Sequence, residues 1–175
     1  MAEERPPNNL RQTSRFITDH SENGLAIFHS DTPERVPAQA IPTGDNLHLA
    51  YATNQFPVDL SKDLATYQQY LINPPAFTVP GGTLLCTIDL APGSTSALHR
   101  TLSLDYAIVI EGIVELQLDS GEAKTLLQGD IAVQRGTKHL WRNKSKADWA
   151  RVVFVLQESK PVEIGGEKLK EDFGF

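Results

Sequence analysis

The chain has 175 residues and a formal net charge of −6, with 40% apolar and 22% charged residues. This length suits one domain with a sizeable core, and the composition is ordinary for a globular protein. An acidic chain without a Lys/Arg cluster is not expected to bind nucleic acid or an anionic membrane. The polar start, MAEERPPNNLRQ, has no apolar core of a signal peptide, and no apolar stretch approaches a membrane span. We therefore expect a cytoplasmic protein.

Residues 1–12 are polar and rich in Pro and Asn, so we expect a flexible N-terminal tail. Residues 13–82 alternate short apolar pieces with Pro- and Gly-rich breaks, a pattern that indicates outer strands joined by long loops. One helix is predicted over 61–71, with Ser61 as its cap and Asn73-Pro74-Pro75 ending it. The residues on one face of this helix are Leu64, Tyr67, Gln68 and Leu71.

Residues 83–160 contain eight short β-type runs separated by turn signals such as Ala91-Pro92-Gly93 and Asp119-Ser120-Gly121. This spacing predicts an all-β sandwich or barrel, followed by a C-terminal extension over 161–175. Cys86, the only cysteine, lies in the apolar run LLCTI. It excludes an intrachain disulfide and a cysteine-based zinc site, and we expect a buried thiol.

Two segments carry the candidate chemistry. If residues 99–105 are extended, His99, Thr101, Ser103 and Asp105 share one face of a strand. A core face would carry Val, Ile or Leu instead, and a solvated face would mix in Lys or Glu. In the second segment His139, Trp141 and Asn143 alternate with Leu140 and Arg142, which places an apolar wall beside an imidazole.

These segments resemble the two motifs of the cupins. The first motif is Gly, five residues, His-x-His, three or four residues, Glu, six residues and Gly. The chain matches its spacing at Gly93, His99, Thr101, Asp105 and Gly112. The second motif is matched at Gly129, Gly136, His139 and Asn143, with Arg135 in place of its proline and one residue fewer between the glycines. The resemblance implies a cupin barrel, a double-stranded β-helix or jelly roll, with one short helix before it.

The resemblance also implies a metal held by three His and one Glu. Here His99 and His139 are kept, Asp105 replaces the Glu, and Thr101 replaces the remaining His. One reading is a three-ligand site of His99, Asp105 and His139 for a divalent Fe, Zn or Mn ion. The other has no metal cofactor. The same three residues are then catalytic acid–base groups, and Asp105 favours the protonated histidines.

A closer resemblance, carried by HRTLSLDY and VQRGTKHLWRN, is to single-domain cupins common in filamentous fungi, some encoded beside polyketide synthases. It implies a tailoring enzyme acting on a small molecule by dehydration, isomerisation, cyclisation or aromatisation. Thr101 and Ser103 would bind the substrate's oxygens and Trp141 would form a wall. The alternatives are a metal-dependent oxygenase or decarboxylase, and a cupin that only binds a ligand.

Further expectations concern the assembly, organic cofactors and residues outside the proposed site. The family resemblance implies a homodimer. The sequence carries no flavin or nicotinamide fingerprint such as a Gly-rich strand-to-helix turn. We expect Tyr106, which follows Asp105, to point into the core, and we assign no function to His20, His29 and His48, which have no partner at ligand spacing.

Overall fold

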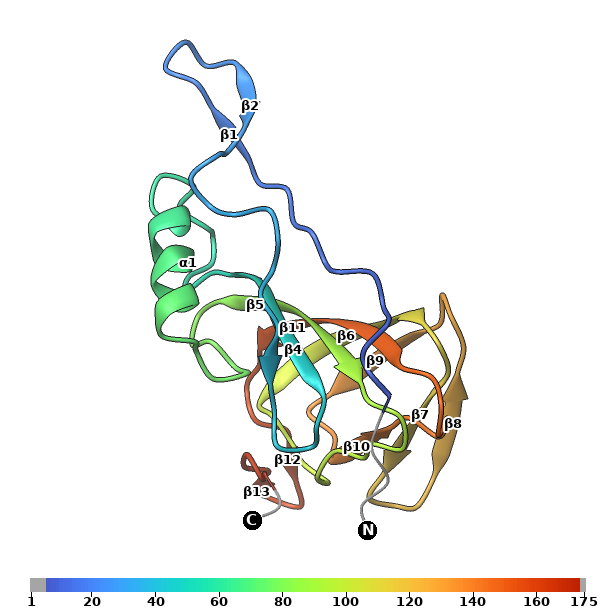
Figure 1. Cartoon of the computed structure of the whole chain (residues 1–175). Helices are drawn as coiled ribbons and strands as arrows, with labels where there is room; N and C mark the ends of the chain where they lie inside the picture. The colour runs from blue at the N-terminus through green and yellow to red at the C-terminus, as the bar shows by residue number, and fades with distance from the viewer. Residues whose placement is uncertain (1–5, 174–175) are drawn as a thin grey trace.

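The structure is a computed structural model that describes residues 6–173. These residues form thirteen strands and a single α-helix, so the predicted all-β barrel with one helix before it is confirmed (Figure 1). In the described part of the chain, no helix is long and apolar enough to cross a membrane.

Six strands form the larger sheet, in the order β3-β4-β5-β11-β6-β9, with every neighbouring pair antiparallel. Their bounds are β3 Gln39–Ala40, β4 Asn46–Ala52, β5 Thr83–Leu90, β6 Ser103–Glu111, β9 Ile131–Arg135 and β11 Ala150–Glu158. Strand β4 comes from the segment before the helix, yet it pairs with the first strand of the predicted barrel, β5.

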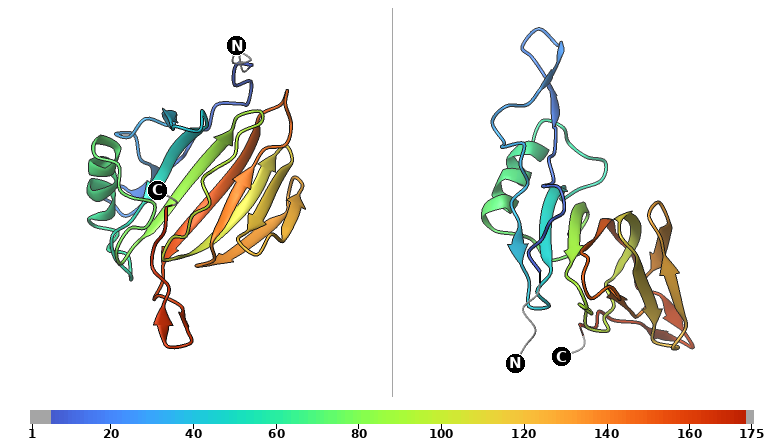
Figure 2. Two further views of the ribbon diagram at one scale, coloured as in Figure 1. Left: turned by 90° about the horizontal axis from the view of Figure 1, so that it is seen from below. Right: turned by 45° about the vertical axis from the view of Figure 1, so that its right-hand side comes forward.

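A three-stranded sheet, β10-β7-β8, closes the barrel opposite the larger sheet (Figure 2). Its bounds are β7 Val114–Leu118, β8 Ala123–Leu126 and β10 His139–Arg142. Side chains of both sheets meet in one apolar core, where the Trp141 ring of β10 lies edge-on to the Phe154 ring of β11 with centroids 5.5 Å apart. The alternation of buried residues along β11, Val152, Phe154 and Leu156, is what a half-buried strand requires.

The outward face of β6 and β9 is apolar and partly exposed. Tyr106 pairs with Val133, and Ile108 pairs with Ile131. Tyr106 is 39% exposed, so its expected place in the core is wrong: it points to the other side of β6 from Asp105, which is the solvent side.

The helix α1 spans Asp63–Ile72 and packs against β4, close to the predicted range. Ser61 does not cap it. The flanking residue is Lys62, without a side-chain cap, and the Ser61 hydroxyl donates instead to Asp59 at 2.6 Å. Asp59 begins the turn, because its backbone oxygen accepts the N–H groups of Lys62 and Asp63.

Within the segment expected to be a flexible tail, Pro6, Asn8 and Arg11 form hydrogen bonds with the barrel. Trp149 Nε1 donates to the Pro6 carbonyl at 3.0 Å, and the Asn8 amide donates to Asp89 at 2.8 Å. Residues 1–5 lie outside the described residues. Beyond this segment, β1 Thr18–His20 and β2 Ala26–Phe28 form a hairpin that projects from the barrel (Figure 1).

The C-terminal extension folds back on the barrel after a short hairpin of β12 Glu163–Ile164 and β13 Glu167–Lys168. Arg100 and Asp172 exchange backbone hydrogen bonds of 2.6 and 3.0 Å, and Lys138 Nζ pairs with the Asp172 carboxylate at 2.5 Å. The extension therefore lies beside the residues that follow His99 and precede His139. Residues 174–175, the end of the Phe-Gly-Phe sequence, lie outside the described residues.

Candidate functional site

His99 and His139 are brought together by backbone pairing. Strand β6 begins only at Ser103, but His99 forms an isolated antiparallel bridge with His139, the first residue of β10. Each N–H donates to the other's carbonyl at 2.9 Å. Side chains of directly paired residues stand on the same face, and the two imidazole centroids are 4.5 Å apart. His139 is buried, while His99 is only half-buried and connects the site to the surface.

The inner face of the strand after His99 carries the three predicted polar side chains. Thr101, Ser103 and Asp105 are 4%, 0% and 4% exposed, so they do share a buried face. Ser103 donates to the Thr101 hydroxyl at 2.7 Å, and Thr101 donates to Asp105 Oδ2 at 3.5 Å. Both hydroxyl protons thus point along a chain toward Asp105, which orients that carboxyl; their direct contact with a substrate stays a prediction.

The backbone fixes which nitrogen of each imidazole carries a proton. Nδ1 of His99 lies 2.8 Å from the Ala97 carbonyl, and Nδ1 of His139 lies 2.8 Å from the Thr137 carbonyl. Because a carbonyl only accepts, each Nδ1 must donate. In the neutral ring Nε2 is then the bare nitrogen, free to accept a proton or to act as a ligand.

The pKa values of Asp105 and His139, two buried residues of the site, shift in opposite directions. Burial raises the pKa of Asp105, against the opposing effects of the Ser103 and Thr101 hydroxyls and of His99. Burial lowers the pKa of His139 to about 4; the Thr137 carbonyl opposes this shift and His99 adds to it. The expectation that Asp105 would favour a protonated His139 is therefore wrong: loss of hydration on burial is the largest cause of the shift, and Asp105 is not among the groups that shift this pKa.

Gln134 is a site residue that the motifs did not indicate. It lies on β9 directly opposite Asp105 and is 3% exposed. Neither its Oε1 nor its Nε2 has a hydrogen-bond partner, and Asp105 Oδ1 has none either. The alternation in IAVQR places Ala132 and Gln134 on one face and could have drawn attention to it, but only the pairing of β9 with β6 sets it opposite Asp105.

Trp141 follows His139 on the inner face of β10, as predicted. It is 4% exposed, it contacts Phe154, and its Nε1 is buried without a partner. Asn143, the last residue of the second motif, has a structural role: its amide donates to the Leu90 and Asp148 carbonyls.

The predicted metal ligands have the right chemistry but are not placed as a set. Two imidazole Nε2 atoms and a carboxylate oxygen are suitable ligands for Fe, Zn or Mn. Within residues 6–173, however, no three His, Cys, Asp or Glu side chains are arranged to hold a metal ion.

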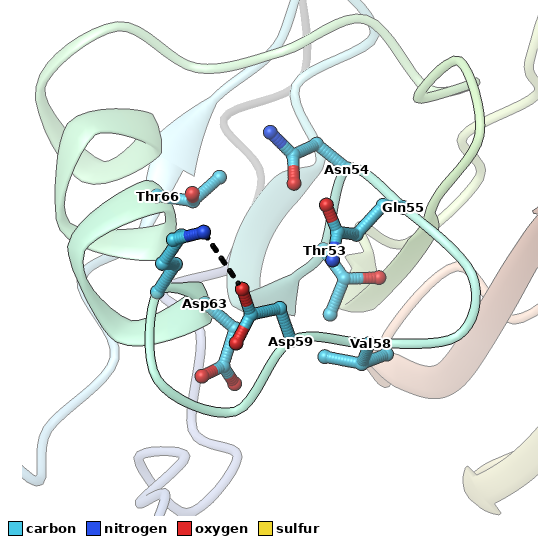
Figure 3. Close-up of a pocket in the computed structure, with 8 residues that line it drawn as sticks. Thr53, Asn54, Gln55, Val58, Asp59, Asp63 and Thr66 are labelled. Carbon is cyan, nitrogen blue, oxygen red and sulfur yellow. Dashed lines mark ion pairs between the residues drawn. The ribbon is translucent and has the colours of Figure 1, made fainter.

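Two pockets lie elsewhere on the molecule, and none of the predicted site residues lines either. The first holds about 80 Å³ between α1 and residues 53–59, where Lys62 and Asp59 form an ion pair of 3.0 Å (Figure 3). The second lies between residues 9–10, 111–113 and 143–149.

Two residues outside the site, His48 and Cys86, are buried within the fold. His48 contacts Asp89 at 3.2 Å, a partner distant in sequence, and Arg151 also binds Asp89. This buried cluster ties β4, β5 and β11 together. Cys86 is fully buried as predicted, and burial raises its pKa to about 12.

The two sheets, the paired histidines and the motif spacing define a cupin barrel. No family model matches the chain. The chain is 51% identical over 162 residues to the phomopsin biosynthesis cluster protein C' of Diaporthe leptostromiformis, covering 91% of this chain and 86% of the relative. It is 33% identical over 170 residues to the cupin-domain-containing oxidoreductase srdB of Neurospora crassa, covering 97% and 86%. The chain therefore belongs to this family of fungal cupin-domain proteins.

A solved structure supports the fold. The polyketide cyclase RemF from Streptomyces resistomycificus superposes with a TM-score of 0.50 over 80% of each chain, at 14% sequence identity. At that identity the likeness concerns the arrangement of strands alone.

Proposed function

We propose that this protein is a tailoring enzyme of secondary metabolism that transfers protons on a small oxygenated substrate inside the barrel. The reaction classes are dehydration, isomerisation, and cyclisation or aromatisation. Relatives named after phomopsin and oryzines biosynthesis clusters support the metabolic setting.

The observation that carries the proposal is the geometry of the inner face, where the His99 and His139 rings lie 4.5 Å apart and the buried Asp105 lies within electrostatic reach of His99. The pKa values of Asp105 and His139 shift in opposite directions, which supports the proposal. A carboxyl whose pKa is raised keeps its proton to higher pH and serves as a general acid. A buried imidazole whose pKa is lowered stays neutral and offers Nε2 as a general base. Two titratable groups tuned by their surroundings in this way are typical of acid–base sites.

A dehydration illustrates the roles. His139 Nε2 takes a proton from the carbon next to a ketone, while Asp105 gives its proton to the hydroxyl on the following carbon. The C–O bond breaks, water leaves, and a conjugated double bond forms. His139 is then protonated and Asp105 ionised. His99 lies beside His139 and within electrostatic reach of Asp105, so it is placed to pass the proton back.

The test uses 4-hydroxy-4-phenylbutan-2-one, a β-hydroxy ketone, in D2O. We expect NMR to show deuterium at the carbon between the ketone and the hydroxyl-bearing carbon. The same spectra should show that the probe loses water and becomes the enone. Both should persist in EDTA and disappear in His139→Ala. Absence of both with the wild-type protein, over a series of aryl and alkyl β-hydroxy ketones, would count against proton transfer.

A second candidate is a metal-dependent oxygenase or decarboxylase. It is favoured by the same pair of Nε2 atoms, because metal-binding histidines usually donate their other N–H to a carbonyl or carboxylate. The name of the Neurospora relative, an oxidoreductase, fits it as well. Activity that is abolished by chelation and restored by Fe(II) under oxygen would favour this candidate. A ligand that binds without turning over would favour a non-catalytic cupin.

A further inference from the structure

Unpaired polar atoms gather on the inner face of the barrel. Asp105 Oδ1, Gln134 Oε1, Gln134 Nε2 and Trp141 Nε1 are all buried, and none has a hydrogen-bond partner. Asp105 and Gln134 are direct neighbours across the β6–β9 pair, and Trp141 projects from the facing sheet. Most buried polar groups in proteins are hydrogen-bonded, and leaving one unpaired destabilises the fold. Unpaired buried atoms on two adjacent residues, one of them the proposed acid, are what a site for a ligand that pairs with them would show.

The hydrogen-bonding capacity of these atoms describes the ligand. Gln134 Nε2 and Trp141 Nε1 only donate, so they require an acceptor such as a ketone oxygen. Gln134 Oε1 only accepts, so it requires a hydroxyl donor. Since one amide carries its donor and its acceptor side by side, the matching ligand carries a carbonyl and a hydroxyl close together.

The charges around the site argue against an anionic ligand. Arg100 and Lys138, which stand next to the two histidines in sequence, both bond the C-terminal extension. Arg100 Nε is buried without a partner, but Arg100 alternates with His99 and Thr101 and therefore lies on the opposite face of this segment. Arg151 is buried but binds Asp89. A carboxylate in place of the ketone would meet Asp105 without one of these cations to balance it.

We propose that Gln134 is a specificity-determining residue, and that with Asp105 and Trp141 it selects a neutral hydroxy-ketone over a carboxylate or a ketone without the hydroxyl. This rests on the proposed function, which places the substrate among His99, Asp105 and His139. It goes further by naming the substrate class and a residue that reads it.

Binding is measured by titration calorimetry with three matched probes: 4-hydroxy-4-phenylbutan-2-one, 4-phenylbutan-2-one and 3-hydroxy-3-phenylpropanoate. The wild-type protein should bind the first at least about tenfold more tightly than either of the others, since one hydrogen bond is worth roughly that factor. In Gln134→Leu this preference should disappear. The exposed Gln157→Leu is the matched control and should keep it.

Thermal unfolding supplies a readout that a purely structural glutamine would not give. Without ligand, Gln134→Leu should melt about 2–8 °C higher than the wild-type protein, because it removes two unpaired buried atoms. A lower melting temperature, an unchanged preference in Gln134→Leu, or no preference in the wild-type protein would overturn the proposal. Binding selectivity without turnover would leave it standing while the proposed reaction fails.

Discussion

His99 and His139 exchange both of their backbone hydrogen bonds, and this single antiparallel pair holds their rings 4.5 Å apart. The two residues are 40 positions apart in sequence, one before β6 and the other opening β10. Because the backbone sets the distance, neither ring depends on a metal or a substrate to bring it to the other. At this distance the His99 ring disfavours a charge on His139, and it therefore adds to the lowered pKa of His139.

The buried His139 makes stability depend on pH. Its pKa falls from 6.5 to about 4 on folding, so between these values the unfolded chain binds more protons than the folded one. The contribution of His139 to the free energy of unfolding, about 3 kcal/mol, is fully present above pH 6.5 and is lost as the pH falls through 4. Urea unfolding at pH 7 and pH 4.5 should show a smaller loss for His139→Gln than for the wild-type protein. Asp105 has its pKa raised and opposes this trend, but it does so in both proteins. The exposed His20→Gln should behave as wild type; equal losses in all three would contradict the prediction.

The acid and base should each matter for turnover. We expect Asp105→Asn and His139→Ala to reduce kcat by at least about 100-fold, the usual contribution of one general acid or base. Circular dichroism and a cooperative melt should show that both variants stay folded. His29→Ala is a suitable control because His29 lies away from the barrel beside Asp19. Wild-type turnover in both variants would remove the assignment of the site.

We expect Thr101 to position Asp105, so that its substitution changes the pH dependence of kcat. Its hydroxyl donates to Asp105 and favours the ionised carboxyl, so Thr101→Val should raise the pKa of Asp105 further. If Asp105 acts in its protonated form, the alkaline limb of the pH–kcat profile should move to higher pH. The fall in kcat itself should be modest, about two- to tenfold. A fall in kcat without movement of that limb would indicate a structural role only.

Much of this site could be predicted from the sequence because its key signals are local. The alternation of Thr101, Ser103 and Asp105 is set by strand geometry over a few residues, and the motif spacing places His139 beside His99. Gln134 and His48 were missed for the opposite reason: their partners, Asp105 and Asp89, are joined to them only by strand pairing. The Ser61 cap was wrong because Asp59, two residues earlier, competes for the same hydroxyl.

Assembly should use the apolar outer face of β6 and β9. Ile131 and Val133 are 65% and 54% exposed, and β9 is an unpaired edge of the larger sheet. Covering such a face and edge with a second copy would remove apolar surface from water. We expect light scattering to give twice the 19.3 kDa chain mass at micromolar concentration, and Ile131→Lys to give a monomer. Ile164→Lys, an exposed position in the C-terminal hairpin, is the control. A wild-type mass of 19.3 kDa would contradict the dimer.

The C-terminal extension should protect the backbone next to the histidine pair from local opening. The Arg100 amide donates to the Asp172 carbonyl, whereas the neighbouring His99 amide donates to His139 within the barrel. Deleting residues 161–175 should therefore speed hydrogen exchange of the Arg100 amide at least about tenfold and leave the His99 amide protected, because exchange reports local opening. Lys138→Ala, which removes only the ion pair to Asp172, should have a smaller effect in the same direction, since a partly exposed ion pair contributes little. If Arg100 exchanges at the same rate in the truncated protein, the extension is not what protects this edge of the site. If His99 loses protection as well, the extension supports the histidine pair itself rather than only lying beside it.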